Sequence, residues 1–192
     1  MRARLLLPLL ILVVGLAGLG VASFMIVAQQ SGAGSSSIGG PFRLTSSDGK
    51  EVTDADFKGH PFLVYFGYTH CPDICPTILF EMSQDMKAMG GDKRIRALFI
   101  TVDPERDTPA ALKEYLSSFD PRIVGLTGTR QEINAVEKVY RVYARKIPEN
   151  GGDYAMDHTA IVYLMDKQGR FVTVFNLDRP PQVAAKDLDT YM

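Results

Sequence analysis

The sequence has no tryptophan, only three histidines and only two cysteines among its 192 residues. Positive charge is not in excess either, because 21 lysines and arginines stand against 22 aspartates and glutamates and leave a net charge of −1. Without a clustered basic surface, nucleic acid is not an expected partner. Hydrophobic residues make up 46 % of the chain, which at this length predicts one globular unit with a good core.

The longest apolar segment covers residues 5–28 and contains no charged residue. About 20 apolar residues are enough for a helix to cross the hydrocarbon core of a bilayer. We therefore predict an N-terminal transmembrane anchor at residues 1–28. Arg2 and Arg4 precede the apolar segment, and the bias of positive charge toward the cytoplasm predicts that the rest of the chain lies outside.

A cleaved signal peptide is the alternative to this anchor, because Gly20-Val21-Ala22 offers a small-x-small cleavage site. The apolar run continues beyond that site, which favours an uncleaved helix. No Arg- and Ser-rich transit stretch precedes the helix, so we expect a single-pass protein of a bacterial inner membrane with its soluble domain in the periplasm. A mitochondrial inner membrane, with the domain facing the intermembrane space, is the alternative location.

Residues 29–40 are rich in glycine and serine, which predicts a flexible linker before a folded domain at residues 41–192. Turn chemistry at 47–50 indicates a β-hairpin at the start of the domain, and the apolar run 61–68 is typical of a buried central strand. Helix and strand signals follow: a helix from Pro76 to about 89, a strand at 95–102, a helix at 109–119, a strand at 123–126, a helix from Thr129 to about 142, a loop at 148–157, strands at 159–165 and 171–175, and a last helix after Pro181.

This order of elements is that of a thioredoxin-like fold, an α/β fold in which helices flank both faces of a mixed sheet. Ligand sites in such sheets lie at the carboxyl ends of the strands. Both cysteines come directly after the 61–68 strand, so we expect a functional site in their loop. Asp103 and Asp107 follow the next strand and are expected to be turn and cap residues rather than catalytic acids.

Cys71 and Cys75 are separated by three residues and lie just before the helix predicted from Pro76. A disulfide across so short a loop would stabilise the fold little, which leaves a redox pair or a metal site. In either case the N-terminus of the helix should lower the pKa of the thiols. Thioredoxin-type oxidoreductases use the shorter Cys-x-x-Cys spacing, whereas two thiolates suit Cu(I) and, next, Zn(II). A metal site then needs a third ligand, for which histidine is the first candidate.

The three histidines are not equal candidates for that ligand. His60 precedes the central strand in a turn and is expected to be a solvated loop residue. His70 adjoins Cys71, so ligation by both at once is awkward. His158 lies where the 159–165 strand begins, a junction that faces the cysteine loop in a thioredoxin-like sheet. His158 is therefore the preferred ligand, with His70 as the alternative.

Three sequence blocks resemble the Sco (SenC) family of copper proteins, which serve assembly of the dinuclear copper centre of cytochrome c oxidase. The blocks are YFGYTHCPDICPT at 65–77, TVDPERDTP at 101–109 and DHT at 157–159. The resemblance covers roughly residues 41–177. It implies that Cys71, Cys75 and His158 bind one copper ion, as Cu(I) or Cu(II), and that His70 is not a ligand.

The same resemblance implies a copper chaperone rather than an enzyme. Its expected partners are the copper-accepting subunit of cytochrome c oxidase and, as a further candidate, another periplasmic copper carrier. The alternative is a thiol–disulfide reductase in which Cys71 and Cys75 are the redox-active pair and keep the acceptor's copper-binding cysteines reduced. A peroxidase of the peroxiredoxin type is disfavoured, because the Pro-x-x-x-Thr-x-x-Cys arrangement is absent around Cys71.

Overall fold

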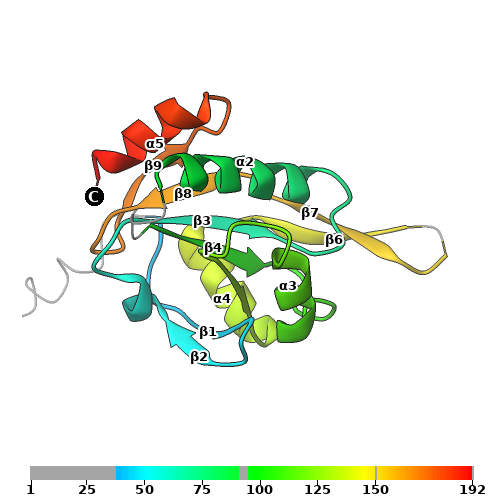
Figure 1. Ribbon diagram of the computed structural model, residues 1–192. Helices are drawn as coiled ribbons and strands as arrows, with labels where there is room; N and C mark the ends of the chain where they lie inside the picture. The colour runs from blue at the N-terminus through cyan, green and yellow to red at the C-terminus, as the bar shows by residue number, and fades with distance from the viewer. Residues whose placement is uncertain (1–37, 91–94, 150, 192) are drawn as a thin grey trace, which may run out of the picture. The chain divides into compact units, whose positions relative to one another are not determined.

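The computed structural model describes residues 38–90, 95–149 and 151–191. Within these ranges a mixed sheet has the strands Arg43–Ser46 (β1), Glu51–Thr53 (β2), Phe62–Gly67 (β3), Arg96–Thr101 (β4), Ile123–Thr127 (β5), Val162–Met165 (β8) and Phe171–Phe175 (β9). Their order across the sheet is β2-β1-β5-β4-β3-β8-β9 (Figure 1). The predicted N-terminal hairpin and central strand are thereby confirmed.

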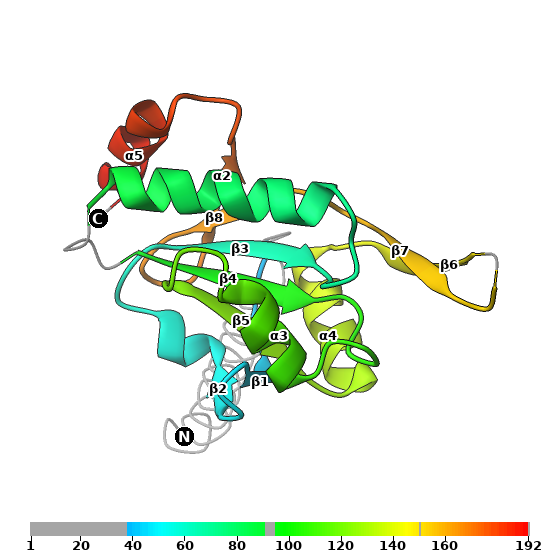
Figure 2. The same ribbon diagram turned by 45° about the vertical axis from the view of Figure 1, so that its right-hand side comes forward.

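Helices lie on both faces of this sheet, as expected for the predicted α/β fold. They are the 3-10 helix Asp54–Phe57 (η1) and the α-helices Ile74–Ala88 (α2), Pro109–Leu116 (α3), Arg130–Tyr140 (α4) and Pro181–Asp189 (α5). Helices α2 and α5 lie together on one face, and α3 and α4 lie on the other (Figures 1 and 2). None of the helices in the described ranges is long and apolar enough to span a membrane. The predicted anchor at 1–28 and most of the predicted linker at 29–40 lie outside those ranges.

The central strands β3, β4 and β5 run parallel, so their carboxyl ends meet at one edge of the sheet. Every residue of β3 is buried, which matches its run of branched and aromatic side chains. Gly67 at the end of β3 pairs with Thr101 at the end of β4, and the N–H of Val102 donates to the carbonyl of Gly67 over 2.8 Å. The loops that leave β3 and β4 therefore start side by side.

Caps at the helix ends follow the local sequence. Thr108 caps α3 by accepting a hydrogen bond from the N–H of Ala111, and Thr129 forms a capping box with Glu132 at the start of α4. The helix ends differ from the prediction: α3 stops at Leu116 and α4 at Tyr140, each two or three residues early. Helix ends depend on local capping, which periodicity does not locate.

The largest difference from the prediction is a second, two-stranded sheet. Residues 148–157, predicted to be a loop, fall mostly within an antiparallel hairpin of Ala144–Pro148 (β6) and Tyr154–His158 (β7). This hairpin projects beyond the end of the main sheet (Figures 1 and 2). The predicted strand at 159–165 is therefore wrong at its start, because the strand of the main sheet, β8, begins only at Val162.

The hairpin lacks the apolar alternation of a strand that packs on a core, because its two strands pair only with each other and, apart from Met156, are half-buried or exposed. A weaker signal was available. Gly151-Gly152 lies between the two segments that form the strands, 144–148 and 154–158. A glycine pair between two short strands is typical of a hairpin turn.

Candidate metal centre

Three side chains that can ligate a metal converge at the carboxyl ends of β3 and β4. Cys71 lies in the loop after β3, Cys75 in the first turn of α2, and His158 at the end of β7. Their donor atoms all lie within 4.8 Å of one another, and Sγ of Cys75 is 3.6 Å from Nε2 of His158. The structure thus brings the three predicted ligands together, while their role as ligands stays a prediction.

The first turn of α2 shapes the cysteine loop. This helix begins at Ile74, two residues before Pro76, so the predicted start was late. Proline fits there because the first N–H groups of a helix have no partner within it. One of these free groups, the N–H of Cys75, donates to Sγ of Cys71 over 3.3 Å. The sulfur of Cys71 thus lies at the N-terminal end of the helix, with a backbone donor aimed at it.

Cys75 is fully buried between β3 and α2. Burial raises the pKa of Cys75 to about 12, although the hydroxyl of Tyr65, which donates to Sγ over 3.3 Å, opposes the shift. The expectation that the helix lowers the pKa of both thiols is therefore wrong for Cys75, because loss of solvent outweighs the helix terminus. A thiol of this kind keeps its proton at neutral pH until metal binding releases it.

The ring of His158 presents its Nε2 atom to the cysteines. Its Nδ1 atom lies 3.1 Å from the carbonyl oxygen of Thr159. Since a carbonyl can only accept, Nδ1 carries the proton of the neutral ring and Nε2 keeps a free lone pair. Burial lowers the pKa of His158, which favours this neutral form. The ring is further oriented by Tyr68, whose ring packs edge-on at 5.8 Å between centroids. Ring form and orientation are those that metal ligation requires.

Gly67 and Tyr65, both on β3, contribute to the site although the sequence analysis gave them no role. A Cβ atom on Gly67 would lie 2.9 Å from Sγ of Cys75 and 2.7 Å from the ring of Phe99. The absence of a side chain therefore makes room for the buried sulfur, to which Tyr65 donates its hydrogen bond. A glycine that ends an otherwise bulky central strand was the available signal, because such glycines mark close approach of another group.

His70, the alternative ligand, is exposed and lies near Thr69 and Asp107. Its Nδ1 atom is 3.0 Å from the hydroxyl of Thr69 and 4.0 Å from a carboxylate oxygen of Asp107. The cluster of converging donor atoms does not contain His70. This placement agrees with the resemblance, which implied that His70 is not a ligand.

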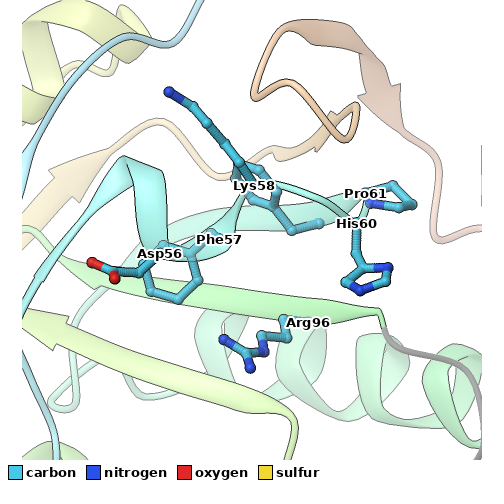
Figure 3. Close-up of a pocket in the computed structure, with 7 residues that line it drawn as sticks. Asp56, Phe57, Lys58, His60, Pro61 and Arg96 are labelled. Carbon is cyan, nitrogen blue, oxygen red and sulfur yellow. The ribbon is translucent and has the colours of Figure 1, made fainter.

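His60 lies before β3, at the opposite end of that strand from the cysteines. There it lines a small pocket of about 70 Å³ together with Lys58 and Arg96 (Figure 3). The basic side chains do not converge in this pocket, and Lys58 pairs with Asp54 at 2.6 Å. His60 is thus remote from the metal-ligating cluster, as expected for a loop residue.

The sequence similarities of the chain extend over this whole domain. The model of the SCO1/SenC family matches residues 30–192. The chain is a member of the SCO1/SenC family. A curated family member, the human mitochondrial SCO1 homologue, is 42 % identical over 159 residues, which cover 81 % of this chain and 53 % of the human protein. The chain spans about half the length of the mitochondrial relatives it matches first.

Solved structures of Sco proteins include copper-bound forms. Copper-bound ScoI of Bradyrhizobium japonicum is 60 % identical with a TM-score of 0.79, over 81 % of this chain and 99 % of that one. Copper-bound yeast Sco1 is 40 % identical with a TM-score of 0.74, over 81 % and 88 %. BsSco, described as a member of the Sco family of cytochrome c oxidase assembly proteins, is 25 % identical with a TM-score of 0.63, over 81 % and 93 %. The family resemblance seen in three sequence blocks is thereby confirmed.

Proposed function

We propose that this Sco-family domain binds one copper ion through Cys71, Cys75 and His158 and delivers it during assembly of the dinuclear copper centre of cytochrome c oxidase. The observation that carries this proposal is the convergence of two thiols and one neutral imidazole within 4.8 Å. The copper-bound structures of the Bradyrhizobium and yeast relatives support the choice of metal.

The donor set suits copper better than structural zinc. Structural zinc sites are completed by four protein ligands, whereas soft thiolates select Cu(I), and an imidazole suits Cu(II) as well. Copper held by such a mixed set can pass between its two oxidation states. The protein's own part is to supply a sulfur in the space that Gly67 leaves open and a ring nitrogen whose lone pair already faces it.

The three ligands differ in how an acceptor can reach them. Cys75 has no exposed surface, whereas Cys71 and His158 are each partly exposed. An acceptor thiolate would therefore approach from the side of Cys71 and His158 and replace the ligands one at a time. Stepwise exchange avoids a free ion, because the metal stays bound to at least one partner throughout.

The N-terminal segments complete the proposal. A membrane anchor at 1–28 and a linker at 29–40 would keep the domain near a membrane-bound acceptor and raise its effective concentration there. The relatives include mitochondrial and rickettsial proteins, which supports a membrane of bacterial or mitochondrial type. We place the domain in the bacterial periplasm, with the mitochondrial intermembrane space as the alternative.

A reductase role is the second candidate, favoured by the free thiols and by the partial exposure of Cys71. In that reaction the Cys71 thiolate attacks an acceptor disulfide, which releases one acceptor thiolate and forms a mixed disulfide. The thiol of Cys75 then gives its proton to the acceptor thiolate already released, and its sulfur attacks the sulfur of Cys71 and releases the second acceptor thiolate. The acceptor gains two electrons, and the domain leaves with a Cys71–Cys75 disulfide.

Copper titration of the full chain in detergent tests the proposal. We expect one Cu(I) per chain under anaerobic reducing conditions and no tight binding in Cys71→Ser. The variant His158→Ala separates the two candidates, because a reductase should keep its rate of thiol exchange while a copper site should lose affinity for Cu(II). If the wild-type chain binds no Cu(I), the copper proposal is wrong.

A further inference from the structure

The loop between β4 and α3 contains two fully buried aspartates, Asp103 and Asp107. One contacts the segment that carries the cysteines, and the other contacts the strand that carries His158. Asp107 binds the segment just before the cysteines. Its carboxylate accepts hydrogen bonds from the N–H of Thr69 over 3.0 Å, from the hydroxyl of Thr69 over 2.6 Å and from the hydroxyl of Thr101 over 2.6 Å. These bonds tie the backbone just before Cys71 to the end of β4.

Asp103 binds the strand that carries His158. One oxygen of its carboxylate accepts a hydrogen bond from the hydroxyl of Tyr154 over 2.9 Å, and the other accepts one from Nε of Arg106 over 2.5 Å. Tyr154 is the first residue of β7, the strand that ends at His158. A buried carboxylate on the main body thus holds the strand that carries the histidine.

Arg106 lies over the same tyrosine and reinforces this contact. Its guanidinium carbon is 3.8 Å from the centre of the Tyr154 ring, and Nη1 donates to Asp153 over 3.1 Å. The guanidinium also lies 5.8 Å from the ring of Tyr68, which packs edge-on against His158. Arg106 therefore contacts both the beginning of β7 and a ring that touches its last residue.

The hairpin needs such contacts, because β6 and β7 pair with each other and not with the main sheet. A two-stranded hairpin alone is marginally stable in water. At its base the hairpin is closed by two hydrogen bonds between Tyr143 and Thr159, of 2.9 and 3.0 Å. Beyond this base the hairpin is held on the body by Met156, which is buried in the core, by the ion pair of Lys146 with Glu105 and by the contacts of Tyr154.

We propose that Asp103, Arg106 and Tyr154 form a latch that positions the β6–β7 hairpin so that His158 reaches the cysteine pair. The inference rests on the proposed function, in which His158 is a copper ligand. The cysteines are held separately by β3, α2 and the bonds of Asp107. Loosening the latch therefore withdraws the imidazole and leaves both thiols in place, so Cu(II) binding is lost selectively while Cu(I) binding by the two thiols is kept.

Three variants of the full chain in detergent test the latch. Tyr154→Phe removes only the hydroxyl that reaches Asp103 and keeps the ring, while Arg106→Met removes the guanidinium. Arg122→Met is the matched control, because Arg122 is similarly buried and pairs with Asp120 at 2.7 Å at the opposite edge of the sheet. The measurements are Cu(I) and Cu(II) affinities by competition with chelators, and amide hydrogen exchange of the hairpin without metal.

We expect the Cu(II) affinity to fall by about 10- to 100-fold in Arg106→Met, the range typical of partners that orient a ligand, and by less in Tyr154→Phe. The Cu(I) affinity should stay unchanged in both. Hairpin amides should exchange faster than in the wild type while those of β3 do not change, and Arg122→Met should match the wild type throughout. A parallel loss of Cu(I) and Cu(II) affinity, or an unchanged Cu(II) affinity, would overturn the latch.

Failure of the proposed function gives a different result. If the wild-type chain binds neither form of copper, the copper assignment is wrong, and the exchange measurement decides the latch alone. Faster hairpin exchange in Arg106→Met than in Arg122→Met, with β3 unaffected, would then support it. Equal exchange in the two variants would contradict it.

Discussion

The cysteines and the histidine of the candidate centre are held by two different parts of the molecule. Cys71 and Cys75 lie between a fully buried strand, β3, and helix α2, which packs on the sheet. His158 ends a hairpin that lies outside the main sheet and contacts the body through a few side chains. Under the proposed function the thiols form the fixed part of the site and the imidazole is held by fewer contacts, so ligand exchange would begin at the histidine.

Removing a thiol from the fixed half should have the largest effect. In Cys75→Ser the buried hydroxyl keeps the size of the side chain but is a poor ligand for Cu(I). We expect both Cu(I) and Cu(II) affinity to fall by more than the roughly 100-fold that loss of an orienting partner causes. Competition titrations measure this, and urea unfolding of the metal-free chain checks that the fold is kept. Retained Cu(I) affinity would show that the buried sulfur is not a ligand.

Gly67→Ala tests how tightly the fixed half is packed. The new Cβ atom would lie within 3 Å of both the Cys75 sulfur and the Phe99 ring. We expect a loss of about 1–3 kcal/mol in the free energy of unfolding, the usual cost of overpacking a core, together with weaker Cu(I) binding. Urea unfolding of the metal-free chain gives the first quantity. An unchanged unfolding midpoint would mean that the sulfur has free space to move.

Asp107→Asn tests the hydrogen bonds that hold the loop of the cysteines. The amide keeps only one of the two acceptor oxygens, so its NH2 group faces either the Thr69 hydroxyl or both the Thr69 N–H and the Thr101 hydroxyl. We expect a loss of about 1–3 kcal/mol in stability and a similar decrease in Cu(I) and Cu(II) affinity. This pattern differs from that of the latch variants, which should affect Cu(II) alone. If Asp107→Asn also spared Cu(I), the division into two halves would be wrong.

Asp85 on α2 offers the smallest expected effect, confined to the body of the domain. The side chain is 2 % exposed, its Oδ2 atom has no hydrogen-bond partner among the described residues, and burial raises its pKa from 3.8 to about 6. Because the folded pKa is the higher one, ionisation costs stability as the pH rises from about 4 to 6, and the cost stays constant above that range.

We therefore expect Asp85→Asn to stabilise the chain by about 1–2 kcal/mol at pH 7–8 and to have no effect near pH 4. The gain is less than the pKa shift alone implies, since a buried amide also lacks partners. Unfolding curves at several pH values measure the effect, and hairpin amide exchange serves as the control that should not change. A stability difference independent of pH would contradict the account of Asp85.

The two halves also differ in how far the sequence predicted them. The cysteine half was predictable because its signals are local: an apolar strand, two cysteines and a helix within about 30 residues. The start of α2 was predicted two residues late, and the pKa of Cys75 was misjudged because burial by distant segments is not visible in a local motif. His158 was predicted as a ligand, but its strand was predicted as a loop.

The hairpin was missed because the contacts that hold it connect residues far apart in the chain. Tyr154 and Asp103 are 51 positions apart, and no periodicity links them. Asp103 and Asp107 were interpreted as turn and cap residues. The turn is confirmed for Asp103, whose carbonyl accepts from the N–H groups of Arg106 and Asp107, but Thr108 is the cap of α3. The two carboxylates also bind the hairpin and the cysteine loop. Side chains that act across the fold in this way leave no local signal in a single sequence.

The most direct test of the central claim is pulsed electron paramagnetic resonance of the Cu(II)-loaded chain, in the wild type and in His158→Ala. The account predicts one strongly coupled imidazole nitrogen together with thiolate ligation in the wild type, and loss of that nitrogen coupling in the variant. An identical nitrogen coupling in both proteins, or a spectrum without thiolate ligation, would contradict a copper site formed by Cys71, Cys75 and His158.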